Sequence, residues 1–444
     1  MNDKKEFKFN YGGKEVIIET GRLAKQADGA VLMTCEGTQV LVTVCSAKEV
    51  NDGQDFFPLM VDYKEKFSAA GKFLGGYMKR EARPGNHEIL LMRMIDRPLR
   101  PLFPEGYMFE TIVMAQVLSY DPAVDPEVLA GLGAAAALEI SDIPFSGPLG
   151  FCKVAKIDGK LVLNPATTEL EKSEIELVVA ASSDAILMVE GEASEVSEED
   201  MLEAINFGHD NIKEFCKLLK DVQKKVGKKK REFKSVAANT KLVEAVASKF
   251  KNEARQCLEI TDKLERQDAI NALQKTIIGA LQVAPAQFNL TEESDFKKEG
   301  KKATDEVMYK MMRADIIKDS KRIGGRKLDE IRPIETEVNL LKRVHGSSLF
   351  TRGETQVLAS VTLGGKEGEQ MSDRLTGLFY DKFYLHYTFA PYSVGEARGY
   401  RGVGRREVGH GNLAERALKE MLPSQAEFPY TIRVSCEVTE SNGS

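Results

Sequence analysis

The 444-residue sequence contains no tryptophan, and aromatic residues make up only 7% of it. Few side chains are therefore available to stack on bases. The six cysteines include no CxxC pair, which indicates buried reduced thiols rather than a disulfide framework or a zinc site. No run approaches the roughly 20 apolar residues of a spanning helix, and the first residues lack the apolar core of a signal peptide. These absences predict a cytoplasmic protein without a membrane segment.

The chain also lacks an excess of positive charge. Its 62 Lys and Arg residues against 68 Asp and Glu residues give a formal net charge of −6, which argues against general binding of polyanions. Any contact with nucleic acid must then come from local basic clusters. The length and the hydrophobic content of 42% are typical of a globular protein with two or three domains.

An internal repeat is the most informative feature that the sequence does have. Aligning Gly29 with Gly346 pairs GAVLMTCEGTQVLVTV with GSSLFTRGETQVLASV, and eight of these sixteen positions are identical. A second match follows in the same order, because GGYMKREARPGN and GYRGVGRREVGHGN place Lys79-Arg80-Glu81 on Arg405-Arg406-Glu407. The sequence therefore predicts a duplicated fold, with a hairpin in each copy.

In both copies of the second match, a glycine-rich loop carries two adjacent cations and a Gly-Asn dipeptide then opens an apolar helix. In the second copy this helix is predicted from Asn412 to Met421. Two cations beside glycines that allow close backbone approach suit a phosphodiester and the anion that attacks it. A solvated basic loop is the alternative for an isolated Arg-Arg pair.

The corresponding helix of the first copy is expected to be capped by Asn86 and to end at Pro98. Arg93 and Arg97 lie four residues apart and so share one face, and Arg100 follows shortly after. Three arginines with only Asp96 nearby suggest an anionic partner. Salt bridges to another domain or subunit are an equal alternative.

The strand after each helix also differs between the copies. Aligning Thr111 with Thr431 sets Asp121-Pro122-Ala123-Val124 against Ser441-Asn442-Gly443-Ser444. A loop of small residues with free N–H groups can hold a phosphate, whereas Pro122 lacks an N–H and Asp121 would repel the anion. By itself the serine-containing loop is an ordinary turn. Together with Arg405 and Arg406 it predicts that the second copy carries the chemistry.

The repeat divides the chain into three predicted domains: residues 1–234, a helical domain at 235–322, and the second copy at 323–444. The basic run from Lys224 to Lys234 is interpreted as a solvated linker or a nucleic-acid contact. The first copy continues for about a hundred residues past the point that matches Ser444. We therefore expect the second copy to be incomplete here.

Several longer stretches resemble the bacterial polynucleotide phosphorylase family. They are FFPLMVDYKEKFSAAGKFLGGYMKREARP, MIDRPLRPLFPEGY, HGSSLFTRGETQVLASVTLG, RREVGHG and FPYTIRVSCEVTESNGS. The similarity covers almost the whole chain in the family's order. It implies an α/β fold of two RNase PH-like cores, of the ribosomal protein S5 domain 2-like type, joined by an all-helical domain, with the second core incomplete.

The resemblance also implies an enzyme, a polyribonucleotide nucleotidyltransferase of mRNA turnover. Such an enzyme degrades RNA from its 3′ end with inorganic phosphate, releases nucleoside diphosphates, and runs in reverse as a template-independent polymerase. Mg²⁺, a homotrimer and membership of an RNA-degradation complex are implied as well. For the chain as it stands, the alternative is a non-catalytic RNA-binding or ring-forming scaffold.

The resemblance assigns roles to individual residues. Arg405 and Arg406 match catalytic arginines that hold RNA and phosphate, and His410, Gly443 and Ser444 match phosphate-binding positions. The residues that match RNA-binding positions are Tyr77, Lys79, Arg80, Arg83, Arg93, Arg97 and Arg100. The family usually has two phenylalanines and two arginines where this chain has Tyr77-Met78-Lys79-Arg80. Tyr77 can stack on a base, whereas Met78 has no aromatic ring and Lys79 lacks the two-pronged donor group of an arginine. No metal ligand is expected within the chain, because the family's two aspartates and lysine lie beyond the position of Ser444.

Overall fold

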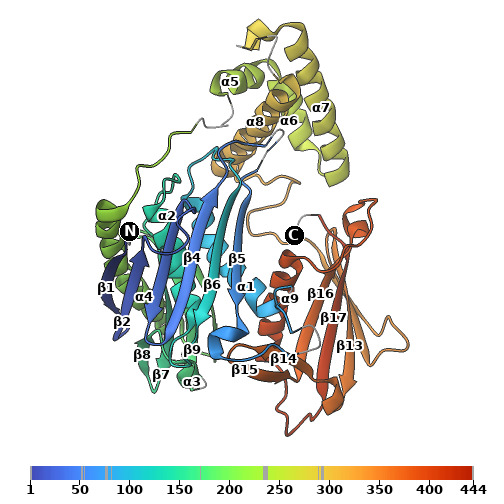
Figure 1. The fold of residues 1–444 in the computed structure, drawn as a ribbon. Coiled ribbons are helices and arrows are strands. Elements are labelled where there is room, and N and C mark those ends of the chain that lie inside the picture. The colour runs from blue at the N-terminus through green and yellow to red at the C-terminus, as the bar shows by residue number, and fades with distance from the viewer. Residues whose placement is uncertain are drawn as a thin grey trace. The chain divides into compact units, whose positions relative to one another are not determined.

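The computed structural model describes residues 3–51, 54, 56–75, 79–81, 83–170, 172–233, 239–288, 290–291 and 295–442 (Figure 1). The chain forms two compact units. One unit comprises Met1–Asn51, Phe56–Lys234 and Ile334–Ser444, and the other comprises Asp52–Asp55 and Ser235–Pro333. The two copies of the repeat thus belong to one unit, although the repeat predicts a domain for each copy.

Six strands form the main sheet of the first copy, in the order β1-β2-β3-β4-β6-β5. Their bounds are β1 (Lys5–Tyr11), β2 (Lys14–Thr20), β3 (Gly29–Cys35), β4 (Thr38–Ser46), β5 (Leu59–Glu65) and β6 (Thr111–Ser119). The predicted hairpin of the first copy is confirmed, since β3 pairs with β4 around Glu36-Gly37. Another hairpin pairs β1 with β2 around Gly12-Gly13. The edge strand β5 runs parallel to β6.

The second layer of the first copy is a four-stranded sheet with a buried helix between it and the main sheet. Its elements are α2 (Pro126–Ile140), β7 (Gly150–Ile157), β8 (Lys160–Leu163), α3 (Thr167–Leu170), β9 (Ser173–Ala181), β10 (Ile186–Ala193) and α4 (Glu198–Val226). A Cβ at Gly133 of α2 would lie 2.6 Å from Val42 of β4, and one at Gly131 would lie 2.6 Å from Phe151 of β7. The small residues of α2 therefore allow both sheets to approach it closely.

The second copy repeats the main sheet. Its five strands follow the order β11-β12-β13-β17-β16, which matches β2-β3-β4-β6-β5. Their bounds are β11 (Ile334–Val338), β12 (Gly346–Arg352), β13 (Thr355–Gly364), β16 (Phe383–Phe389) and β17 (Thr431–Glu440). The edge strand β16 again runs parallel to its neighbour β17. The predicted duplication is thus confirmed at the level of topology (Figure 1).

Strand pairing shifts the expected alignment of β6 with β17 by one residue. Val117 pairs with Val40, and Val438 pairs with the repeat equivalent of Val40, which is Val357. Asn442, rather than Ser441, is therefore the counterpart of Asp121. The alignment from sequence missed this shift because too few residues are identical between the two strands to distinguish one register from the next.

Each copy places one helix beside its parallel strand pair: α1 (Asn86–Leu99) packs on β5, and α9 (Arg405–Lys419) packs on β16. The helices begin in the same way, with Gly85 N–H donating to Glu88 Oε2 at 2.8 Å and Gly404 N–H donating to Glu407 Oε2 at 2.6 Å. A carboxylate at the third helical position satisfies a backbone N–H at the N-terminus of each helix.

These helix starts correct three expectations. Gly85, not Asn86, is the N-cap, and Pro98 lies inside α1, which ends at Leu99. Helix α9 begins at Arg405, not at Asn412, so Arg405 and Arg406 lie in its first turn rather than in a loop. The structural counterparts of Arg405 and Arg406 are consequently Asn86 and His87.

The pairing of Lys79-Arg80 with Arg405-Arg406 is therefore wrong. The copies diverge between two equivalent one-turn helices, η1 (Phe67–Ala70) and η5 (Pro391–Val394), and the starts of α1 and α9. Gly71 and Gly395 end the short helices in the same left-handed conformation. The segment between the short helix and the long helix is longer in the first copy. Lys79 and Arg80 lie in this segment and have no equivalent in the second copy.

Two residues of the basic run, Lys230 and Arg231, pack on the first copy, so neither interpretation holds at these positions. Lys230 Nζ donates to the carbonyls of Leu138, Glu139 and Ser141 at 2.8, 3.1 and 3.1 Å, and so caps the end of α2. Arg231 forms an ion pair with Asp142 at 2.6 Å. At these positions the run is part of the fold, neither a free linker nor an open nucleic-acid contact.

The other unit is helical, as predicted for residues 235–322. It contains α5 (Thr240–Lys249), α6 (Lys251–Glu259), α7 (Lys263–Val283), a short η3 (Pro285–Phe288) and α8 (Phe296–Asp319). Leu242, Val246, Ile277, Leu281 and Phe288 are buried at its centre. Across the described part of the chain, no helix combines the length and the apolarity needed to cross a membrane.

A hairpin of the second copy is anchored in the core of the first copy. It consists of β14 (Gln370–Arg374) and β15 (Gly377–Asp381). Leu375 at its tip is 1% exposed and belongs to the hydrophobic core of the first copy. The carbonyl of Leu375 accepts a hydrogen bond from Lys72 Nζ at 3.3 Å. The hairpin therefore joins the copies through buried apolar surface as well as a polar contact.

We expect Leu375→Ala to lower the free energy of unfolding by about 2–5 kcal/mol, because it leaves a cavity in a packed core. Urea unfolding of the chain measures the change. Leu378 lies in the same hairpin but is 51% exposed. Leu378→Ala should therefore change stability by less than about 0.5 kcal/mol. Equal effects of the two variants would show that the tip is not an anchor.

Candidate active site

The first turn of α9 lies at the carboxyl ends of β16 and β17. Glu407 Oε1 accepts a hydrogen bond from the N–H of Phe389, the last residue of β16, at 2.7 Å. Beyond β17, Ser441 N–H donates to the carbonyl of Ser393 at 2.8 Å. A helix N-terminus at such an edge presents unpaired N–H groups and the positive end of the helix dipole, which favours an anion. Gly443 and Ser444 lie outside the described residues.

Arg406 and His410 of α9 form an electropositive cluster together with Arg93 of α1. His410 Nδ1 lies 3.4 Å from the hydroxyl of Tyr387 on β16. Burial lowers the pKa of His410, and the positive charges of Arg406 and Arg93 lower it further. Among the described residues, neither of these two arginines has an acidic partner. The cluster can therefore accept an anion.

Arg93 reaches this cluster from the first copy. A Cβ at Gly409 of α9 would lie 2.4 Å from Arg93 Nε, so the glycine provides the space that the guanidinium occupies. Helices α1 and α9 pack against each other around this contact. The candidate anion site is thus built from both copies.

Arg405 points elsewhere. Its Nη1 donates to the carbonyl of Val61 at 2.9 Å, and its Nη2 donates to Asp62 Oδ1 at 2.5 Å. Both acceptors lie on β5 of the first copy. The structure therefore separates the two adjacent arginines: Arg406 lies with His410, while Arg405 binds the edge of the other sheet.

The arginines of α1 also separate. Arg97 forms an ion pair with Glu190 of β10, and Arg100 forms one with Asp96 at 2.7 Å. Both pairs lie within the first copy, and not with another domain or subunit as the alternative expects. Arg93 has no acidic partner in the described part of the chain. A groove of about 400 Å³ nevertheless brings Arg93, Arg97, Arg100 and Arg405 together beside β5.

The segment with the expected RNA-binding residues Tyr77, Lys79, Arg80 and Arg83 is described only in part. Lys79, Arg80 and Arg83 are exposed, and Lys79 has a positive φ of 50°. Tyr77 lies outside the described residues. The RNA-binding role of these residues stays a prediction.

The counterpart of this site in the first copy is neutralised by carboxylates. His87, which stands where α9 has Arg406, lies 3.3 Å from Glu65 and 3.6 Å from Glu127. The buried Lys153 lies 2.7 Å from Asp125 and also contacts Glu127 at 3.4 Å. A second anion would meet negative charge here. These carboxylates distinguish the first copy from the candidate site of the second, and that only the second copy carries the chemistry stays a prediction.

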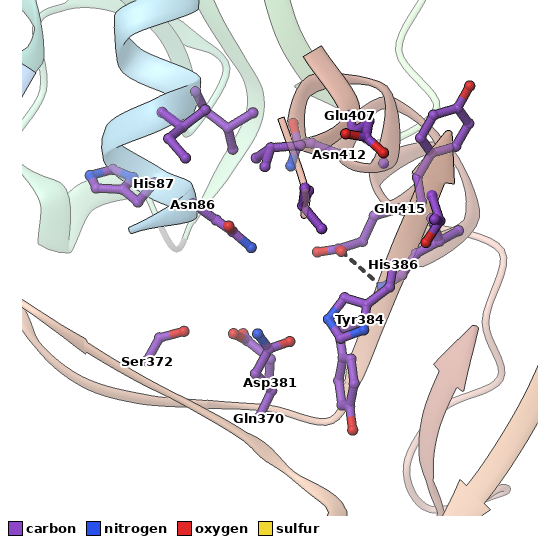
Figure 2. A pocket seen from close by; sticks show the side chains of 18 of the residues that line it. Asn86, His87, Gln370, Ser372, Asp381, Tyr384, His386, Glu407, Asn412 and Glu415 are labelled. Atoms are coloured by element: carbon purple, nitrogen blue, oxygen red, sulfur yellow. Dashed lines mark hydrogen bonds between the residues drawn. The ribbon is translucent and has the colours of Figure 1, made fainter. Parts of the chain in front are cut away.

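A larger cavity of about 790 Å³ opens beside the edge of β16 (Figure 2). Asn86 and His87 of α1 face it from one side, and Asn412 and Glu415 of α9 face it from another. Its floor includes Asp381 with Gln370 and Ser372 from the β14–β15 hairpin. The sequence analysis did not find these hairpin residues. The only signal for them is that the second copy is longer than the first between β13 and β16.

Within the described ranges, no group of three or more His, Cys, Asp or Glu side chains is placed to hold a metal ion. The described residues therefore contain no site that would give Mg²⁺ three such ligands.

The duplicated sheets and the basic helix N-terminus between them define a class: a duplicated α/β protein with a candidate anion site made jointly by its two copies. The family comparison is more specific. Residues 12–144 and 330–444 match the model of the 3′ exoribonuclease family, domain 1, and residues 147–211 match domain 2 of the same family. The chain belongs to the 3′ exoribonuclease family. Residues 241–327 match the model described as the RNA-binding domain of polyribonucleotide nucleotidyltransferase.

Curated relatives agree with this assignment. The chain is 48% identical over 434 residues to the polyribonucleotide nucleotidyltransferase of Geotalea uraniireducens, covering 98% of the chain and 61% of the relative. It is 47% identical to that of Zymomonas mobilis, covering 100% of the chain and 58% of the relative. For Bdellovibrio bacteriovorus the identity is 47%, with coverages of 98% and 62%. The chain thus spans about three fifths of the length of these relatives.

The charge on His87 should make stability depend on pH. Burial disfavours this charge and Arg374 opposes it, but the hydrogen bond to Glu65 and the charge of Glu127 raise the pKa of His87 overall. A raised pKa in the folded state stabilises the protein below the unfolded pKa, and the gain is lost as the pH rises through the folded pKa. His87→Gln should therefore cost about 1–2 kcal/mol at pH 5.5 and much less at pH 9.

Urea unfolding at the two pH values tests this expectation. The control is the same comparison in a Glu65→Gln background, which removes the nearer carboxylate and should reduce the pH dependence. A cost of His87→Gln that does not change with pH would contradict the assigned charge.

The anion cluster predicts a shift of the pKa of His410. A bound sulfate would stabilise the imidazolium and raise this pKa, so sulfate affinity should rise as the pH falls through it. NMR titration of the His410 ring with and without sulfate measures the effect. Arg406→Ala should raise the pKa of His410 without sulfate and weaken the response to sulfate. An unchanged pKa at saturating sulfate would show that the ion binds elsewhere.

Proposed function

We propose that this chain contributes to a phosphorolytic 3′→5′ exoribonuclease that degrades RNA to nucleoside diphosphates and can run in reverse as a template-independent polymerase. The observation that carries the proposal is the Arg406–His410–Arg93 cluster at the N-terminal part of α9. Family membership supplies the substrate class, because the curated relatives are named polyribonucleotide nucleotidyltransferases. Inorganic phosphate and an RNA 3′ end are the proposed ligands.

In the proposed reaction, an oxygen of inorganic phosphate attacks the phosphorus of the last phosphodiester. A new P–O bond forms, the bond to the 3′-oxygen of the preceding nucleotide breaks, and that oxygen leaves with the proton given up by the attacking phosphate. The products are a nucleoside diphosphate and an RNA one nucleotide shorter. Negative charge spreads over the phosphoryl oxygens in the transition state, so fixed cations there lower the barrier.

Arg406 and Arg93 are the proposed cations, and the helix N-terminus adds N–H donors and a favourable dipole. His410, with its pKa lowered, is the neutral donor between them. No protein nucleophile is required, because phosphate itself attacks. Gly443 and Ser444 keep their proposed phosphate-binding role.

The groove along β5 is the proposed path for the RNA backbone. Arg93 is the proposed direct contact, while the ion pairs of Arg97 and Arg100 with Glu190 and Asp96 suit residues that shape the groove. Tyr77, Lys79, Arg80 and Arg83 are proposed to grip RNA farther from the reacting bond. The use of Mg²⁺, a cytoplasmic location, a homotrimeric assembly and an RNA-degradation complex belong to the proposal through the family resemblance.

The test is phosphate-dependent release of nucleoside diphosphates from poly(A). It uses the 444-residue chain and, in parallel, a protein extended to the length of the relatives. We expect release by the extended protein. Release of monophosphates without phosphate would refute phosphorolysis. RNA binding with neither product in both proteins would instead support a non-catalytic scaffold.

Within an active protein, Arg406→Ala should lower kcat by about 100- to 1,000-fold, because it removes one cation at the reacting phosphate. The matched variant Lys79→Ala/Arg80→Ala removes two exposed cations and should mainly weaken binding of long RNA. Single-turnover kinetics on short and long RNA separates the two effects. Equal losses of kcat would contradict the proposed division of roles between the copies.

A further inference from the structure

We propose that Asp62 of the first copy is a positioning residue for the anion site of the second copy. Together with the Val61 carbonyl it holds Arg405, and this contact fixes the first turn of α9 so that Arg406 faces the anion. The inference rests on the proposed function. It assigns different roles to two adjacent arginines that sequence reasoning treats alike.

The contact is a two-point attachment. Arg405 donates through Nη1 to Val61 O at 2.9 Å and through Nη2 to Asp62 Oδ1 at 2.5 Å. A guanidinium is planar and presents its donors in a rigid fork, so two acceptors fix both its position and its orientation. The side chains of Arg405 and Asp62 are 41% and 32% exposed. The pair therefore positions α9 more than it stabilises the fold.

The contact also completes an exposed sheet edge. Arg100 donates to the carbonyls of Phe57 and Leu59 at 3.0 and 3.1 Å, and Arg405 donates to the next outward carbonyl, that of Val61. An edge strand has unpaired carbonyls that need a donor. Along β5, one arginine from each copy supplies those donors. Arg405 thus has a structural task that occupies its two terminal nitrogens.

The position of Arg406 follows from that of Arg405. Successive residues of an α-helix point about 100° apart, so fixing Arg405 on β5 directs Arg406 to a different side. There its charge acts on Tyr387 and His410. Glu407 holds the same turn from the other side through Phe389 N–H and Gly404 N–H. The first turn of α9 is therefore held by both copies, as a preorganised binding site requires.

The first copy lacks the reciprocal contact. The counterpart of Arg405 is Asn86, a shorter and neutral side chain that faces the cavity beside β16 (Figure 2). Among the described residues, no hydrogen bond joins Asn86 to the second copy. The positioning therefore acts in one direction, from the first copy onto the site of the second.

The experiment compares Asp62→Ala and Asp62→Asn in the chain by calorimetric titration with inorganic phosphate. We expect Asp62→Ala to weaken phosphate binding about tenfold, since misplacing a binding group by about 1 Å can cost up to about 100-fold. Asp62→Asn retains an acceptor and should bind within about threefold of the parent. In the extended, active protein, Asp62→Ala should raise KM for phosphate more than it lowers kcat.

The control is Asp210→Ala, which breaks an exposed ion pair with Lys213 on α4, outside the groove and α9. It should leave phosphate affinity unchanged. If Asp62 acts through Arg405, the double variant Asp62→Ala/Arg405→Ala should bind phosphate as Arg405→Ala does. If Asp62→Ala folds poorly, Arg405→Ala tests the same contact from its other partner. We expect Arg405→Ala to weaken phosphate binding as well.

The outcomes separate this inference from the proposed function. If the parent chain binds phosphate and Asp62→Ala binds it equally well, Asp62 has no positioning role, although the anion site stands. If Asp210→Ala weakens binding as much as Asp62→Ala does, the effect is not specific to the Arg405 contact and the inference fails. If the parent binds no phosphate and the extended protein shows no phosphorolysis, the proposed function itself fails.

Discussion

The packing of α9 against α1 is the constraint on which the rest of the site depends. Gly409 has no side chain, and Arg93 occupies the space that a Cβ would need. Farther along α9, Arg416 forms ion pairs with Glu190 and Glu192 of the first copy, each at 2.9 Å. The helix is therefore held against the first copy at its start, middle and end. Neither copy by itself contains the complete cation cluster.

Duplication placed the same geometry at two positions, and the surrounding charges made them different. His87 and Arg406 occupy equivalent places in the first turns of α1 and α9. Around His87, Glu65 and Glu127 supply the negative charge that a buried cation requires. Around Arg406 the described residues supply further positive charge instead. One position consequently contributes to stability, whereas the other is suited to an external anion.

The local patterns of the sequence were enough to identify the duplicated sheets. Alternating apolar residues and glycine turns predict the hairpins, and the identities between Gly29 and Gly346 onward align them. The same evidence did not locate the start of α9. Its N-cap is a glycine, and a glycine in a glycine-rich stretch gives no distinct start signal.

By itself the sequence determined the duplication, the α/β character of each copy and the helical unit between them, since these follow from periodicity and from identities within the chain. Only the tertiary structure decided which arginines pair with an acid that is distant in the sequence. Arg97, Arg100 and Arg405 each bind an acceptor or an acid, while Arg93 and Arg406 do not among the described residues. The reason is physical: Glu190 and Asp62 lie far from their partners along the chain. Folding alone brings those charges within a few ångströms, where they decide which cations remain available.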